Sequence, residues 1–209
     1  MRTLGIDEAG RGCVLGPLFV GAFLYDGGGP EPLWDAGAAD SKRLSPARRA
    51  AVRSRLEALG TWEVVAIDAE RIDTGNLNTL EEEAIAALVA RHRPDRVIID
   101  ALGPPSALPA ALRRLQAASG VEAEWLMEPK ADANHAPVAA ASIFAKTERD
   151  AHLEQLRERW GALGSGYPSD PTTRRWLLDL AARGAQWPPF VRTRWDTIAK
   201  LSQQALALR

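Results

Sequence analysis

Residues Gly5–Gly12 read GIDEAGRG, an apolar segment that ends in two adjacent acids followed by a glycine-arginine-glycine stretch. Successive side chains of a regular strand alternate between faces, so Asp7 and Glu8 reach one site only if the strand ends there and the chain turns. The glycines of AGRG permit that turn, because glycine tolerates backbone angles that other residues avoid. The stretch therefore predicts a strand that brings two carboxylates to its end.

Two further acids follow the same logic. Asp100 ends the aliphatic run VIID, and Asp132 in KAD precedes a long helical pattern. A carboxylate beside such a core is costly unless it is paired or bound to a metal. The ends of adjacent strands and a helix start would bring these four acids together, and an all-carboxylate cluster favours Mg²⁺ or Mn²⁺.

Each acid taken singly is also compatible with a turn or a helix cap. Asp150 in AKTERD is a fifth candidate. Its spacing makes it an i,i+4 partner of Lys146 on a helix surface, so we leave it out of the metal set.

Composition bounds the class of protein. The chain has 209 residues, 46% hydrophobic and 25% charged, which is typical of a globular domain. With 26 basic and 27 acidic side chains the net charge is −1, so bulk charge gives no nucleic-acid signal. The single cysteine, Cys13, excludes an internal disulfide and fits the reducing cytoplasm. Without an apolar run of about 18 residues, no membrane association is expected.

Hydrophobic periodicity and turn residues predict an α/β chain. Strands are expected over residues 2–7, 13–26, 61–68, 96–100 and 121–127, and helices over 45–60, 78–93, 106–119, 136–161, 171–184 and 196–208. Three strands come first and strands then alternate with helices, which favours a mixed sheet flanked by helices. We expect a catalytic domain over residues 1–165 and a helical extension over 166–209 packed on it. Residues 171–209 carry seven basic and two acidic side chains, which fits either a solvated surface or an extension folded over the catalytic body.

Several motifs in order resemble ribonuclease HII, the type 2 ribonuclease H family, in its archaeal and eukaryotic form. They are GIDEAGRG, VLGPLFVGA, DSKRLS, KADANHAPVAAASIFAKTERD and GSGYPSDP, running from residue 5 to about 171. The resemblance implies a ribonuclease H-like fold with a five-stranded mixed sheet. It implies an endonuclease that cleaves RNA in RNA–DNA hybrids and nicks duplex DNA 5′ to single ribonucleotides, leaving 5′-phosphate and 3′-hydroxyl ends, as in ribonucleotide excision repair.

The resemblance also implies roles for single residues. The family's four metal-binding acids match Asp7, Glu8, Asp100 and Asp132, which would hold two Mg²⁺ or Mn²⁺ ions. The choice of Asp132 over Asp150 rests mainly on this match. The family's ribose-reading turn matches Gly10, Arg11 and Gly12, and Tyr167 matches its tyrosine that packs beside the ribonucleotide. Lys42 matches a substrate-contacting lysine, and Lys146 and Arg149 match basic helix residues near the phosphates. Without the resemblance, Tyr167 reads as a small structural anchor, and Lys146 and Arg149 as solvated helix charges.

The chain departs from the family pattern at three places. Cys13 replaces the usual proline, and IDALGPPSA lacks the common glycine after the third acid. The C-terminal LSQQALALR has no aromatic residue, so binding to a sliding clamp through the usual glutamine-plus-aromatics peptide is not expected. We expect a monomer.

Three alternatives compete with this reading. If the chain were a different nuclease on the same fold, the glycine-arginine-glycine turn and the GSGYP loop would have no evident function. Ribonuclease HIII carries an N-terminal substrate-binding domain, for which the position of the first acid at residue 7 leaves no room. A hybrid-binding module that has lost catalysis conflicts with the presence of all four acids.

Overall fold

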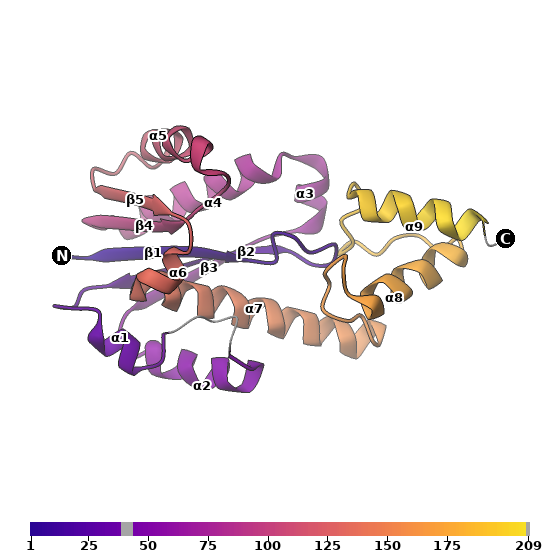
Figure 1. Ribbon diagram of the computed structural model, residues 1–209, viewed down its shortest axis with the longest axis horizontal. Coiled ribbons are helices and arrows are strands. Elements are labelled where there is room, and N and C mark those ends of the chain that lie inside the picture. Colours follow the sequence, from indigo (N-terminus) through magenta and orange to yellow (C-terminus); the bar gives the residue numbers. More distant parts are fainter. Residues whose placement is uncertain (39–43, 208–209) are drawn as a thin grey trace.

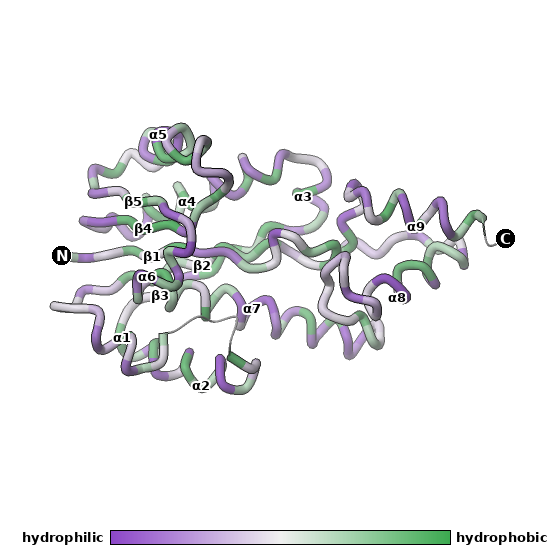
Figure 2. Tube along the Cα trace, in the orientation of Figure 1, coloured by the Kyte–Doolittle hydropathy of each residue, from purple (hydrophilic) through white to green (hydrophobic). Residues whose placement is uncertain are grey.

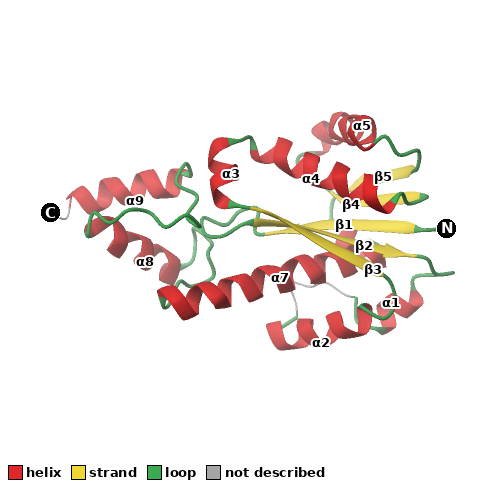
Figure 3. Ribbon diagram, turned by 180° about the vertical axis from the view of Figure 1, so that it is seen from behind, coloured by secondary structure: helices red, strands yellow, loops and turns green. Residues whose placement is uncertain are grey.

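The computed structural model describes residues 1–38 and 44–207, and places one mixed sheet between two layers of helices (Figures 1 and 3). The strands are β1 (Thr3–Ala9), β2 (Leu18–Tyr25), β3 (Thr61–Ile67), β4 (Arg96–Asp100) and β5 (Glu124–Glu128). Their order in the sheet is β3-β2-β1-β4-β5. The first three strands pair antiparallel, while β4 and β5 run parallel to β1. The predicted five-stranded mixed sheet is confirmed.

The helices cover both faces of this sheet. Their bounds are α1 Glu31–Asp35, α2 Pro46–Leu56, α3 Ala69–Thr74, α4 Leu77–His92, the short 3₁₀ helix η2 Pro105–Ala107, α5 Leu108–Ser119, α6 Ala131–Asn134, α7 Ala136–Trp160, α8 Pro171–Ala182 and α9 Asp196–Ala207. Helices α4 and α5 lie on one face, and α1, α2 and α7 lie on the other (Figure 3). Helices α8 and α9 stand at the end of the molecule opposite the N-terminus (Figure 1).

Local signals explain where several helices begin. Ser45 caps α2 by accepting a hydrogen bond from the amide of Arg48, and Pro46 follows as the first helical residue. Asn76 caps α4 through the amides of Asn78 and Thr79, so the helix begins at Leu77, one residue before the predicted start. Short helices α1, α3 and α6 were not expected, because four to six residues give too little periodicity to detect.

Two hydrophobic cores sandwich the sheet. On the α4 face, Ile85, Leu88 and Leu115 pack against the strands, and on the α7 face Ala140 and Phe144 do so. Figure 2 shows hydrophobic colour along the central strands and alternating hydrophobic and hydrophilic stretches along α9. In the described part of the chain, no helix is both long and apolar enough to cross a membrane.

A third core joins the C-terminal helices to the segment that follows β1. Val14 and Leu15 are buried with Leu177 of α8 and with Ile198 and Leu201 of α9. The predicted strand over residues 13–26 starts only at Leu18. The residues before it bond to the C-terminal part instead, because the amide of Val14 donates to the carbonyl of Gly166 and that of Gly16 to the carbonyl of Phe190. Their one strand-like contact in the described structure is the bridge between Leu15 and Val191.

Candidate active site

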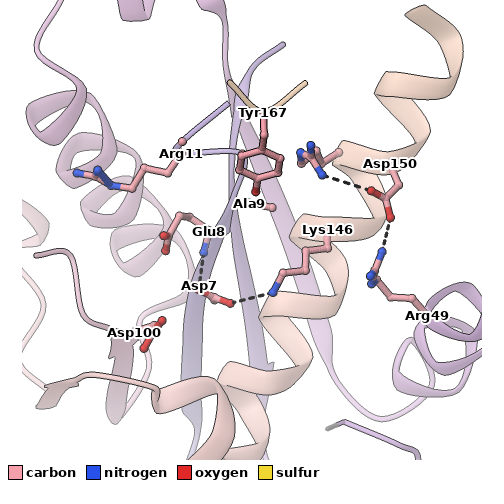
Figure 4. Close-up of a pocket in the computed structure, with 12 residues that line it drawn as sticks. Asp7, Glu8, Ala9, Arg11, Arg49, Asp100, Lys146, Asp150 and Tyr167 are labelled. Carbon is pink, nitrogen blue, oxygen red and sulfur yellow. Dashed lines mark hydrogen bonds and ion pairs between the residues drawn. The ribbon is translucent and has the colours of Figure 1, made fainter. Parts of the chain in front are cut away.

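A cavity of about 470 Å³ opens where β1 and β4 end beside α7 (Figure 4). Most of the candidate residues that the sequence analysis names line this cavity. Its lining consists of Asp7, Glu8, Ala9, Gly10, Arg11, Gly12, Arg49, Asp100, Lys146, Arg149, Asp150 and Tyr167.

Strand register brings three of the predicted acids to this cavity. The last parallel pair between β1 and β4 is Ile6 with Ile99, so Asp7 and Asp100 follow at the same level on neighbouring strands. Our expectation that β1 ends at Asp7 is wrong, since the strand continues to Ala9 through its pairing with β2. Beyond Ile6, however, β1 has a partner on only one side. The cavity lies at this free edge, and both Asp7 and Glu8 line it.

The acids repel one another in a buried place. Burial raises the pKa of Asp7, and Asp100 raises it further, whereas Lys146 and a hydrogen bond from Ser142 lower it. Burial raises the pKa of Glu8 well above its ordinary value, and the charges of Asp7, Glu81 and Asp100 all act in the same direction. Such a group of crowded carboxylate oxygens is chemically suited to a hard divalent cation.

Asp132 is not one of the residues that line the cavity. It lies on α6 with only 5% of its surface exposed. The adjacent amide of Ala131 donates a 2.9 Å hydrogen bond to Oδ1 of Asp100, which ties α6 to the end of β4. Within residues 1–38 and 44–207, no three Asp, Glu, His or Cys side chains are already gathered as a metal centre. The fourth-ligand role of Asp132 stays a prediction.

Helix α7 supplies the cationic wall. Lys146 Nζ donates to Ser142 Oγ at 2.6 Å and lies 3.9 Å from Oδ2 of Asp7. Lys146 thus faces the first acid, rather than forming the surface pair with Asp150 that the spacing suggested. Asp150 instead accepts a hydrogen bond from Arg49 of α2 and lies 3.6 Å from Arg149, so it holds two cations at the cavity.

The glycine-arginine-glycine turn lies directly beside the acids. Gly10 has φ +87°, a left-handed conformation that favours glycine, and its carbonyl accepts the amide of Cys13 at 3.1 Å. A Cβ atom on Gly12 would lie 3.7 Å from the ring of Tyr167. The Arg149 guanidinium stacks 4.8 Å from the centre of that ring and also donates to the carbonyl of Ser165. The turn and the tyrosine therefore form one continuous wall.

Sequence reasoning missed Glu81, which is 1% exposed on α4. Its Oε2 accepts a 3.0 Å hydrogen bond from Nε of Arg11, while Asn78 accepts a second bond from the same guanidinium. Burial raises the pKa of Glu81 to about 7 against the opposing charge of Arg11. A signal was present: Glu81 precedes Ile85 by four residues and Leu88 by seven, so it lies on the apolar stripe of its helix.

Sequence reasoning also missed Arg192, one of the seven basic residues of the C-terminal stretch. It is fully buried, not solvated. Its guanidinium donates to the carbonyl oxygens of Gly10 at 2.8 Å, Arg11 at 2.9 Å and Gly16 at 2.9 Å. Irregular backbone carries residues 190–192, so no periodicity in the sequence could reveal this contact. Lys42, the remaining substrate-binding candidate, lies outside the described residues.

Comparisons with known proteins agree on one family. The model of the family described as ribonuclease HII matches residues 4–198. The ribonuclease HII of Pyrococcus horikoshii is 37% identical, covering 98% of this chain and 94% of the relative. The crystal structure of ribonuclease H2 from that organism matches with a TM-score of 0.90 over 99% of both chains.

Two other solved structures extend the comparison. The ribonuclease HII in a complex with PCNA from Archaeoglobus fulgidus matches with a TM-score of 0.84 at 35% identity, covering 94% of this chain and 96% of that one. The structure of Bst-RNase HIII in complex with Mn²⁺ has a TM-score of 0.77 and covers 100% of this chain and 70% of that one, but at 22% identity it shows the fold alone. Family model, identity and coverage together establish that this chain belongs to the ribonuclease HII family, the endoribonucleases that act on RNA–DNA hybrids.

Proposed function

We propose that this protein nicks duplex DNA 5′ to a single embedded ribonucleotide, besides cutting the RNA strand of hybrids. The observation that carries the proposal is the continuity of one cavity wall. Asp7 and Glu8 are followed within the same cavity by the Gly10–Gly12 turn and by Tyr167. The group that cuts and the group that examines the sugar are thus parts of one short segment. Products would carry 5′-phosphate and 3′-hydroxyl ends.

We assign the metal-binding role to Asp7, Glu8, Asp100 and Asp132. Two divalent ions, Mg²⁺ or Mn²⁺, would supply the charge that activates water and stabilises the departing 3′ oxygen. Support comes from the raised pKa values of Asp7 and Glu8, since mutual repulsion in a buried cavity is relieved by a cation. Asp132 enters through α6, whose Ala131 amide is bonded to Asp100.

We assign sugar recognition to the turn. The 2′-hydroxyl is the chemical feature that distinguishes RNA from DNA at a given sugar. Gly10 and Gly12 allow a sugar to approach the backbone, and Tyr167 offers a ring face beside it that Arg149 supports from behind. Lys146 and Arg149 lie where phosphates would pass, and we keep Lys42 as a further substrate contact on the strength of the DSKRLS motif alone.

The test compares the wild-type protein with Asp7→Asn on a DNA duplex that contains one ribonucleotide, in Mg²⁺ or Mn²⁺. We expect a nick 5′ to the ribonucleotide, with product ends checked by mass spectrometry, and its loss in the variant. Asp26→Asn serves as the matched control, because Asp26 is 69% exposed and belongs to no part of the cavity.

Two results would contradict the proposal in different ways. Cutting of continuous hybrids alone would refute the roles of the turn and of Tyr167. Binding of the duplex without cutting in either metal would instead favour a module that has lost catalysis.

We further propose a monomer that acts in the cytoplasm, consistent with one cysteine, Cys13, that is buried. Assembly with a sliding clamp is the printed property of the Archaeoglobus relative. Residues 201–209, LSQQALALR, lack the aromatic side chains of the usual clamp peptide. We therefore expect a peptide of residues 201–209 not to bind a purified clamp in calorimetry, and micromolar or tighter binding would refute this.

A further inference from the structure

Arg192 is a buried cation held by neutral partners. Its guanidinium donates to three backbone carbonyls, and its backbone amide donates to the carbonyl of Val14 at 2.9 Å. None of the ion pairs among the described residues includes it, although Trp195 lies 5.4 Å from its guanidinium carbon. Burial lowers the pKa of Arg192 to about 10, so it stays charged at neutral pH. Burying a charged group costs solvation free energy, so the group stays charged only if it makes several good hydrogen bonds.

The three carbonyls belong to the glycine-arginine-glycine turn and its exit. Gly10 and Gly16 both have left-handed backbones, with φ +87° and +81°, and Arg11 follows Gly10. The guanidinium fits this task because its planar fork presents five N–H groups in fixed directions, whereas a lysine ammonium would be a point charge.

Holding the carbonyls also sets the direction of the amides. In a planar trans peptide, the C=O and the N–H point in opposite directions. The peptide that carries the Gly10 carbonyl carries the amide of Arg11, and the peptide that carries the Arg11 carbonyl carries the amide of Gly12. No hydrogen bond among residues 1–38 and 44–207 uses either amide. With both carbonyls drawn to Arg192, both amides are left for a ligand in the cavity that the turn lines.

We propose that Arg192 is a positioning residue for ribose recognition, and that it makes the C-terminal segment part of substrate discrimination. By fixing the carbonyls of Gly10, Arg11 and Gly16, it presents the amides of the turn to the sugar. This inference rests on the proposed function, because it assigns the ribose contact to the same turn.

The test uses Arg192→Lys, which keeps the charge but loses the fork, and Arg192→Gln. The control is Asp73→Ala. Asp73 of α3 accepts hydrogen bonds from Thr193 at 2.6 and 2.7 Å and from the amide of Arg194 at 3.3 Å. Its removal therefore loosens the same segment and takes one negative charge from the surroundings of Arg192, but it removes no hydrogen bond between Arg192 and the turn.

The first readout is kinetic. We expect both Arg192 variants to lose roughly 10- to 100-fold in kcat on the single-ribonucleotide duplex, because a misaligned turn no longer orients the sugar. The KM should change little, and continuous hybrid should be cut with a smaller loss. Asp73→Ala should keep the wild-type ratio between the two substrates. An equal loss on both substrates, or the same change in Asp73→Ala, would show general loosening and overturn the proposal.

The second readout needs no activity. Cys13 is the only cysteine, is fully buried, and donates its amide to the same Gly10 carbonyl that Arg192 holds. We expect a maleimide to label Cys13 much faster in the Arg192 variants than in wild type or Asp73→Ala, under conditions where circular dichroism shows folded protein. Folded variants with slow labelling and unchanged discrimination would overturn the inference. If the wild type fails to nick the single-ribonucleotide duplex, the proposed function fails, while the labelling still reports whether Arg192 holds the turn.

Discussion

Glu8 is the least compensated charge of the cavity, because burial and the three neighbouring carboxylates all raise its pKa. Asp7, by contrast, has Lys146 at 3.9 Å and a hydrogen bond from Ser142. Residues chosen for catalysis are often destabilising in the absence of their ligand. The two adjacent acids should therefore respond differently to neutralisation.

Glu8→Gln should stabilise the metal-free protein at pH 8, since burial and the neighbouring carboxylates disfavour the ionised form of Glu8 and the amide carries no charge. We expect the melting temperature in a chelator to rise by roughly 2–4 °C, which corresponds to about 1 kcal/mol for a chain of this size. Added Mg²⁺ or Mn²⁺ should raise the melting temperature of the wild type by mass action, and that increment should shrink in the variant. Glu83→Gln, at an exposed position of the same charge, should change neither quantity. A melting temperature of Glu8→Gln below that of the wild type would show that repulsion among the acids does not destabilise the metal-free protein.

Glu81 gives a pH dependence with a definite sign. Its pKa rises from 4.5 in the unfolded chain to about 7 in the fold, so the folded state binds the proton more tightly. Its contribution to stability is complete below pH 4.5 and is lost as the pH rises to about 7. Glu81→Gln should therefore flatten the fall in the free energy of unfolding between pH 5 and pH 8, measured by urea titration. If the free energy of unfolding falls equally with pH in Glu81→Gln and in the wild type, burial does not raise the pKa of Glu81.

Small residues set the contact between the sheet and helix α7. A Cβ atom on Gly21 of β2 would lie 2.5 Å from the carbonyl oxygen of Ala141, and one on Gly5 of β1 would lie 2.1 Å from the backbone of Pro137. Backbone cannot yield as a flexible side chain does. The close approach of α7 is what brings Lys146, five residues beyond Ala141, to Asp7.

Gly21→Ala should cost about 2–3 kcal/mol in the free energy of unfolding, because the helix must move away from the sheet. Cleavage should fall as well, since Lys146 moves with α7. Gly103→Ala is the matched control: nothing lies within 4 Å of its Cβ position, and we expect a change of no more than about 0.5 kcal/mol. Equal stabilities of the two variants would refute the tight packing.

At the scale of helices and strands, much of the structure could be predicted from the sequence. The strand over residues 96–100 was predicted with the correct first and last residue. A buried aliphatic run between a proline turn and an acid fits few structures other than a strand. The sequence also indicated that Asp7, Glu8 and Asp100 lie close together, and all three line the cavity, while their metal-binding role stays a prediction. The register that sets Asp7 level with Asp100, and the extra length of β1, depend on pairing between distant segments and leave no local signal. The burial of Glu81 and Arg192 likewise depends on what packs above them.

Across the whole molecule, the C-terminal helices share a core with the segment that leaves the candidate active site. Leu201 of α9 is 1% exposed in a cluster with Val14 and Leu15, whereas Leu206 of the same helix is 67% exposed. The division into residues 1–165 and 166–209 stays a prediction, and this core gives it a thermodynamic test.

Leu201→Ala should cost about 2–5 kcal/mol, and Leu206→Ala no more than about 0.5 kcal/mol. Because the cluster includes residues that follow β1, we expect the loss to lower one cooperative transition that includes the sheet. Circular dichroism and the labelling of Cys13 should then give the same midpoint. Two separated transitions would show that the extension unfolds as an independent unit.

The contact between Arg192 and Gly10 joins residues 182 positions apart in the chain. A ribosome makes β1 and its two acids early, yet the arginine that holds the turn leaves the ribosome only after almost all of the catalytic body. Until then the nascent polypeptide has the carboxylates but lacks the contact that we propose aligns the turn with a ribose. On that proposal, the order of synthesis delays ribose recognition until almost all of the chain has been made.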